Sequence, residues 1–336
     1  MSQTRTCLVL AALLGGAAGT AHAQTFESVG TRAAGMAGAF TAVADDASAA
    51  YWNPAGLASG NLFSMVLDRT TVKVDPAGAD SARQTSGLLV AIGMPALALS
   101  YYRLEHTRIT PVFQPTADPS AGRQPGAGNL IRLDRLITNH TGATVVQSLA
   151  AGIALGATFK VVRGVAASGV LPDQDRASLL SSDSELMGKS SSKFDVDVGV
   201  MATSGRLKAG LTLRDVTQPE FGTADGSEPF RLRRQVRAGL AWTPIDGWAV
   251  SVGQDLTRNQ NETEAVRSFA AGTEGRISKK AFVRSGFRVN TAGPRRASVA
   301  AGASYAVLGP LFVDAQATFG SDTAARGWGV AARLLY

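Results

Sequence analysis

Few side chains in this sequence have the types and spacing that catalysis requires. Beyond residue 23 the histidines are His106 and His140, and neither belongs to an H-x-x-x-H spacing that would hold a metal ion. His140 and Ser148 have the residue types of a base and a nucleophile for acyl hydrolysis. Eight residues of extended strand, however, span more than about 20 Å, which is too far for proton transfer. The sequence therefore predicts a protein that is not an enzyme, with no metal site and no cofactor.

An acidic and aromatic stretch near the N-terminus, residues 45–60, reads DDASAAYWNPAGLASG. Its carboxylate and aromatic side chains could bind to the rest of the chain. Asp45 or Asp46 can cap a short helix over residues 47–52. Pro54 disfavours helical geometry in the residue before it and so ends that helix, and the glycine two residues later permits a tight turn. The segment is too small to fold alone, so we expect it to dock on the rest of the chain.

The remainder of the chain has the pattern of β-strands. Apolar and polar side chains alternate along KFDVDVGVMA (193–202) and RLKAGLTLRD (206–215). Such segments are about ten residues long, the length that a tilted strand needs to cross a bilayer. The predicted strands are 61–74, 84–93, 95–110, 129–149, 153–165, 193–203, 207–215, 231–242, 248–257, 266–275, 280–290, 296–307, 311–319 and 327–336.

The connections between these segments alternate in length. Tight turns are predicted at 93–94, 150–152, 204–206, 243–247, 276–279 and 308–310, and longer connections at 75–83, 111–128, 166–192, 217–230, 258–265, 291–295 and 320–326. Outer-membrane barrels have short periplasmic turns, longer outside loops and an even number of strands. A soluble β-sandwich shows the same alternation of side chains but has no reason to alternate its connections. The sequence therefore predicts an all-β, 14-stranded transmembrane β-barrel.

Charged side chains fall on the strand faces that we expect to line the barrel lumen. These residues are Lys160, Asp195, Asp197, Lys208, Arg214, Arg237, Asp255, Arg284, Arg288, Asp314 and Arg333. They either pair with one another and hold the N-terminal segment, or line a polar path. Pairing is favoured because buried charge must be neutralised.

The two ends of the chain predict export to the bacterial outer membrane. Arg5, the apolar run Cys7–Ala18 and an A-x-A sequence at 21–23 are typical of a signal peptide, here cleaved before Gln24. The last residue, Tyr336, lies on the apolar face of the final segment. This ending resembles the C-terminal strand of outer-membrane proteins, which makes the barrel assembly machinery an expected partner. The predicted domains are a signal peptide (1–23), an N-terminal segment in the lumen (24–60) and the barrel (61–336).

The net charge of +7 indicates partners of opposite charge. Lysine and arginine are scattered, with no basic run beyond Arg231 to Arg234, and aromatic residues are not interleaved with them, so nucleic acid is not an expected partner. In an exported protein, outer-membrane lipid or lipopolysaccharide is the natural partner for such charge.

The run from Arg32 to Leu57, RAAGMAGAFTAVADDASAAYWNPAGL, is similar to the N-terminal hatch of the FadL-like long-chain fatty-acid transporters. It resembles still more the PorV-type and related branch, some of whose members carry a conjugal-transfer TraF label. The resemblance implies a fourteen-stranded barrel plugged by residues 24 to about 60. It also implies that a hydrophobic ligand passes a lumenal pocket and leaves through a kink in the wall. The hatch motif comprises Arg32, Gly35, Met36, Gly38, Asp45, Asp46, Tyr51, Trp52, Asn53, Pro54 and Gly56, in a structural or a gating role.

Two functions stay open at this point. The first is passage of a small hydrophobic molecule across the outer membrane. The second, as in the PorV-type branch, is an assembly or secretion partner that docks other exported proteins, with the connections at 111–128 and 166–192 as the docking loops. The charged lumen is a poor wall for an acyl chain, which weakens the transfer of fatty-acid uptake to this sequence.

Overall fold

The computed structural model describes residues 29–74, 81–112, 130–172, 179–180, 188–224, 226, 229–260, 265–293, 295–321 and 325–336. The predicted signal peptide and its cleavage site lie outside these residues. Among the described residues, no helix is both long enough and apolar enough to span a membrane.

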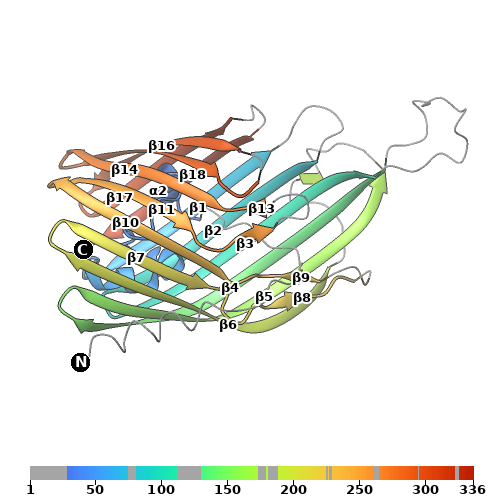
Figure 1. Ribbon diagram of the computed structural model, residues 1–336, viewed down its shortest axis with the longest axis horizontal. Helices are drawn as coiled ribbons and strands as arrows, with labels where there is room; N and C mark the ends of the chain where they lie inside the picture. The colour runs from blue at the N-terminus through green and yellow to red at the C-terminus, as the bar shows by residue number, and fades with distance from the viewer. Residues whose placement is uncertain are drawn as a thin grey trace, which may run out of the picture.

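Fourteen antiparallel strands form a closed barrel, in which the first strand pairs with the last (Figure 1). The strands are β1 (Ser64–Val74), β2 (Ala82–Met94), β3 (Leu97–Val112), β4 (Leu130–Ala150), β5 (Ile153–Pro172), β6 (Lys189–Ser204), β7 (Leu207–Arg214), β10 (Gln235–Ile245), β11 (Trp248–Asp255), β14 (Ser268–Ser278), β15 (Ala281–Asn290), β16 (Ala297–Leu308), β17 (Leu311–Gly320) and β18 (Ala325–Leu335). The predicted 14-stranded transmembrane-type barrel is confirmed.

One end of the barrel carries only two-residue turns between paired strands, as the bounds of the strands show. Several of these turns contain a glycine with positive φ, as in Gly152 (77°) and Gly247 (86°), because tight hairpins need a left-handed backbone that glycine adopts without strain. The turn predicted at 93–94 is wrong by two residues and lies at 95–96. Gly93 is still part of β2 because it faces inward against Leu57.

Two small hairpins interrupt the longer connections at the other end. Phe221 of β8 (Glu220–Phe221) pairs with Phe230 of β9 (Phe230–Arg231), and β12 (Asn259–Gln260) pairs with β13 (Ala265–Val266). The prediction of a strand from residue 231 is therefore wrong at its start, because that residue pairs with β8 and the wall strand begins only at Gln235. Phe221 is buried against the inward side of Gly164, so the β8–β9 hairpin folds into the barrel.

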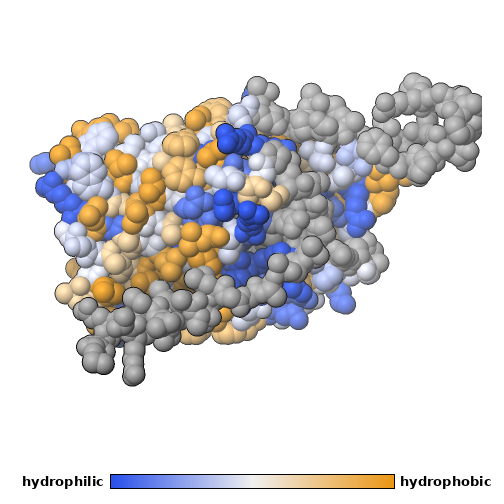
Figure 2. Space-filling model, viewed as in Figure 1, coloured by the Kyte–Doolittle hydropathy of each residue, from blue (hydrophilic) through white to orange (hydrophobic). Residues whose placement is uncertain are grey.

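The outer face of the wall is apolar. Leu67, Phe159, Leu240 and Val299 are among many large hydrophobic side chains that are exposed there. Figure 2 shows orange, hydrophobic residues over much of the visible wall near the short turns, with most of the blue, hydrophilic residues nearer the opposite end. An exposed apolar surface around a closed barrel is the surface that a bilayer covers.

Residues 29–60, here called the inner segment, lie within the barrel (Figure 1). They form α2 (Thr31–Gly35), α3 (Ala49–Trp52) and the 3-10 helix η1 (Pro54–Ser59), and nearly all of them are buried. The helix expected over 47–52 begins two residues late, because Asp46 accepts a hydrogen bond from the backbone N–H of Ser48 and so forms a turn before it. Pro54 opens η1 and ends α3 as expected.

Candidate functional site

The inner segment fits the barrel because inward-facing glycines clear a path for its backbone. Its residues touch successive strands around the wall, beginning with Thr31 at β18 and ending with Ala55 at β5. These contacts define a glycine belt made of Gly156, Gly199, Gly210, Gly239, Gly253, Gly272, Gly286, Gly302 and Gly329.

Several belt glycines are neighbours across paired strands, as in Gly272 with Gly286. A Cβ atom on Gly286 would lie 2.6 Å from the carbonyl oxygen of Met36 and 2.9 Å from the amide nitrogen of Ala37. Only glycine allows so close an approach of two backbones. The belt therefore determines where the inner segment docks.

Two side chains of the predicted motif fix the fold of the inner segment. Asn53 donates through Nδ2 to the carbonyl oxygens of Thr41 (3.0 Å) and Val200 (3.1 Å), and its Oδ1 accepts from the N–H of Ala55. Trp52 donates through Nε1 to the carbonyl oxygen of Val29 at 2.7 Å. These bonds join Trp52 and Asn53 to Val29 and Thr41 in the first half of the segment, and to β6 of the wall.

A closed ring of alternating charges joins the inner segment to the wall near the end with the short turns. The ion ring consists of Arg32, Asp46, Arg333, Asp314, Arg284 and Glu274, with each member within 3.3 Å of the next. Two members belong to the inner segment, and the others belong to β14, β15, β17 and β18. Three positive and three negative groups alternate, and Asp45 also pairs with Arg32 at 2.5 Å, so every charge of the ring has partners of opposite sign.

Asp46 of the inner segment forms ion pairs with two arginines. Its Oδ2 lies 3.0 Å from Nη1 of Arg32 and 3.2 Å from Nη1 of Arg333. Burial alone would raise the pKa of Asp46, but the two arginines and a hydrogen bond from Ser48 outweigh burial and lower this pKa below its ordinary value of 3.8. The ionised form is therefore stabilised, and its contribution to stability is lost only as pH falls below 3.8 toward the lowered pKa.

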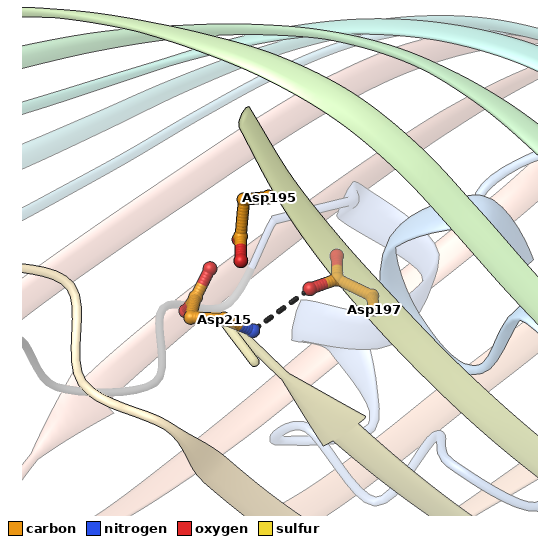
Figure 3. Close-up of side chains that lie close together, drawn as sticks. All are labelled: Asp195, Asp197 and Asp215. Carbon is orange, nitrogen blue, oxygen red and sulfur yellow. Dashed lines mark hydrogen bonds between the residues drawn. The ribbon is translucent and has the colours of Figure 1, made fainter. Parts of the chain in front are cut away.

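A second buried cluster lies across the lumen, around Lys160 of β5. Its Nζ lies 3.1 Å from Asp195, 2.7 Å from Asp197 and 3.0 Å from Asp215. The three carboxyl groups point toward one another, and Asp215 also donates its backbone N–H to Asp197 (Figure 3). Their oxygens lie within 4.8 Å of one another, close enough to ligate a cation. The ammonium group of Lys160 supplies that positive charge.

Aromatic residues connect the Lys160 cluster to the inner segment. Tyr102 accepts hydrogen bonds from Lys160 and Arg214 through its hydroxyl, each at 3.3 Å, and stacks on His140 with ring centroids 4.2 Å apart. Arg214 lies 3.8 Å above the ring of Tyr51, which also packs edge-on against Tyr102. His140 is thus a packed lumenal side chain, while Ser148 is exposed near the β4–β5 turn.

We expect the Lys160→Met variant to unfold at a lower temperature than the wild type. Removing one partner of a buried ion cluster costs about 3–5 kcal/mol, because the carboxylates stay buried without compensation. Millimolar calcium should restore part of the lost stability of this variant alone, since three carboxylates are calcium ligands. The unfolding temperature, followed by gel mobility of the folded barrel, measures both effects. Lys208→Met, at a half-buried lumenal position outside the cluster, is the control. Equal unfolding temperatures for both variants would contradict the role given to Lys160.

The other predicted lumenal charges also lie on the inner face. Arg237 pairs with Asp255 at 2.6 Å, and Arg288 donates through Nε to the carbonyl oxygen of Ala37 at 3.0 Å. Glu274, Tyr102 and Asp215, which complete the two clusters, are not among the site residues predicted from sequence. The alternation of β14 places Glu274 on the same strand face as Gly272, and this alternation would have identified Glu274 as a lumenal residue.

A cavity of about 210 Å³ lies between the inner segment and the wall. Ala34 and Ala37 of the inner segment form its floor, and its sides come from β1, β2 and β14–β18. It reaches residues such as Ser321 at the end of the barrel that carries the longer connections. The ion ring lies nearer the short turns than the cavity does, since Arg284 and Asp314 are in the halves of β15 and β17 next to those turns.

Comparisons with known proteins agree on the fold. The CymD monoaromatic hydrocarbon channel is 13% identical, with a TM-score of 0.64 over 93% of this chain and 97% of that chain. The P. putida toluene transporter TodX is 13% identical, with a TM-score of 0.62 over 93% and 99%. A Pseudomonas aeruginosa FadL homologue is 12% identical, with a TM-score of 0.61 over 92% and 98%. The predicted FadL-like barrel is therefore confirmed as a fold.

Sequence comparison adds one family. The model described as "F plasmid transfer operon, TraF, protein" matches residues 141–255, about a third of the chain. This match confirms the predicted TraF-type label and covers the wall from β4 to β11. No curated protein matches the chain.

Proposed function

We propose that this chain, with the fold of the FadL-type channels, is a gated channel of the bacterial outer membrane that passes a small molecule with an apolar body. The observation that carries the proposal is the cavity between the inner segment and the wall. A barrel that served only as a scaffold would have no need for a cavity that ends at the docked inner segment. The solved channels with this fold are named for hydrocarbons and toluene, which are small and apolar.

The inner segment is the gate in this proposal. The described wall pairings shift register only beside short turns, and β3 pairs without interruption with both β2 and β4. The kink in the wall that the family resemblance implied is therefore not a feature of the described pairings. A molecule in the cavity would leave when the inner segment moves, which requires the ion ring to open.

The docking of exported proteins is the second candidate function. The match to a conjugal-transfer family favours it, because that match includes the two connections on either side of β6 and β7. A docking protein would keep its lumen sealed, which makes conductance the measurement that separates the two functions.

Removing residues 24–60 should convert a barrel that conducts rarely into one that conducts permanently. The reason is that the inner segment closes the lumen between the cavity and the short-turn end. Purified protein in planar bilayers gives the measurement, and heat-dependent gel mobility verifies that the shortened barrel is folded. If the folded, shortened barrel and the intact chain are both silent, the channel function is excluded and docking remains.

A further inference from the structure

The hydrogen-bonding groups that remain available in the cavity are neutral. Of the arginines that line it, Arg288 donates to the backbone of the inner segment, and Arg83 and Arg296 make interactions of their own. Arg326 is exposed at the end of β18, where it stays in contact with solvent. The remaining polar lining consists of hydroxyl and amide side chains, so these are the groups that a ligand can bind.

Gln316 of β17 is a buried amide in this lining. It is only 6% exposed, and its Oε1 accepts a hydrogen bond from Oγ1 of Thr318 at 2.9 Å, which fixes the direction of the amide. Its Nε2 has no hydrogen-bond acceptor among the residues that the structure describes. A buried donor without a partner costs free energy, and a ligand that accepts from it recovers that free energy.

Gln316 and Thr318 together present one donor and one acceptor. They lie two residues apart on the inward face of β17, and the Thr318 hydroxyl, whose hydrogen goes to Gln316, keeps its lone pairs for a ligand. A hydroxyl group can accept from Nε2 and donate to Oγ1 at the same time. A carboxylate can only accept, and a methyl group can do neither. The pair therefore favours a hydroxyl group over both.

The apolar side of the cavity begins directly beside this pair. Gly327 of β18 lies between Thr318 and Val72 of β1 in the strand register. A Cβ atom on Gly327 would lie 3.0 Å from Cγ2 of Val72 and 3.5 Å from Cβ of Thr318, so these two side chains are neighbours. Val74, and Ala34 of the inner segment, extend the apolar surface. The volume of about 210 Å³ is below the roughly 300–1,000 Å³ of ordinary ligand pockets, so a long acyl chain does not fit within it.

We infer that the cavity binds a small neutral molecule with a hydroxyl group on a compact apolar body, of which a phenol is the simplest. The hydroxyl group lies between Nε2 of Gln316 and Oγ1 of Thr318, and the ring lies against Val72. The inference rests on the proposed channel function for its biological role, but the binding itself requires only the cavity. It gives this chain a ligand class different from the hydrocarbons for which the solved channels are named.

Phenol and toluene are matched probes, since they differ only in the hydroxyl or methyl group on one ring, and benzoate adds a charged probe. Equilibrium dialysis of the full chain in detergent at pH 7 measures binding, with protein-free micelles as the blank because the probes partition into detergent. We expect phenol to bind about tenfold more tightly than toluene, which is about 1.4 kcal/mol. Gln316→Leu, which is close in shape, should remove that preference without weakening the binding of toluene.

Ser100→Ala is the control, since Ser100 is a buried serine of β3 that is not among the described lining residues of the cavity, and its loss should leave the preference unchanged. If Gln316→Leu does not yield a folded barrel by heat-dependent gel mobility, Thr318→Val should reduce the preference instead. Equal binding of phenol and toluene, tighter binding of benzoate than of phenol, or a preference that persists in both β17 variants would overturn the inference. A preference for phenol without conductance in any variant would instead overturn the channel function and leave the hydroxyl site standing.

Discussion

The Glu274→Gln variant is expected to conduct ions in a planar bilayer far more often than the wild type. Glu274 holds Arg32 of the inner segment through two bonds, of 2.8 and 2.7 Å, and holds Arg284 at 2.5 Å. Glutamine removes one of the carboxylates that pair with each of these buried arginines, and breaking a buried ion pair costs about 3–5 kcal/mol. Since each 1.4 kcal/mol is a factor of ten, the open fraction should rise by about two to three and a half powers of ten.

A matched control and a rescue make this prediction specific. Glu220→Gln removes an acid that pairs with Arg231 on the partly exposed β8–β9 hairpin, and it should leave conductance unchanged. The double variant Arg32→Leu with Glu274→Leu removes one charge of each sign from the ion ring. It leaves Arg284 on Asp314 and Arg333 on Asp46, so it should conduct less than Glu274→Gln alone.

If the Glu274→Gln variant conducts as rarely and is as stable as the Glu220→Gln variant, the ion ring does not hold the inner segment in place. A double variant that conducts more than the single variant would also contradict the ring, because it would show that the two residues act separately.

The Gly286→Val variant is expected to expel the inner segment from its docked position while leaving the barrel closed. The new side chain would overlap the backbone of Met36 and Ala37, because Met36 lies directly against Gly272 and Gly286 on two paired strands. Overpacking typically costs about 1–3 kcal/mol, and backbone contact belongs at the upper end of that range. At 3 kcal/mol the exposure of the inner segment should rise by roughly a hundredfold.

Cysteine labelling measures this exposure directly. The sequence has one cysteine, Cys7, so a Val43→Cys substitution places the reporter in the inner segment of a chain without other cysteines beyond residue 23. Maleimide should modify Val43→Cys slowly in the parent and much faster with Gly286→Val. Ala301→Val on neighbouring β16 adds bulk to the outer face and is the control. Equal labelling rates in all three proteins would show that the glycine belt does not determine docking.

The position of the wall strands could be predicted from sequence because alternation and turn length are local properties. Lipid on one side and packed lumen on the other force a period of two, so Phe194, Val196 and Val198 could be assigned to one face without a structure. The same period placed the lumenal charges, such as Asp195 and Lys160, on the inner face. It misplaced the start of β10, because residues 230–231 favour a strand that pairs with β8 and not with the wall.

Only the closed barrel determines which charged side chains form ion pairs with one another. Arg32 and Glu274 are 242 positions apart, and no local pattern relates them. The glycine belt likewise depends on the closed barrel. Within one strand a glycine only weakens that strand, and it becomes part of the belt because strand register places it beside the next belt glycine.

The sequence by itself determined the strands, their inward and outward faces and the presence of a motif that must be buried, because these depend on neighbours along the chain. The tertiary structure decided how the inner segment docks, how the charges close into a ring and where the arginine-lined cavity lies. Each of these depends on distances across a lumen, which barrel closure and register set and which no short stretch of residues encodes.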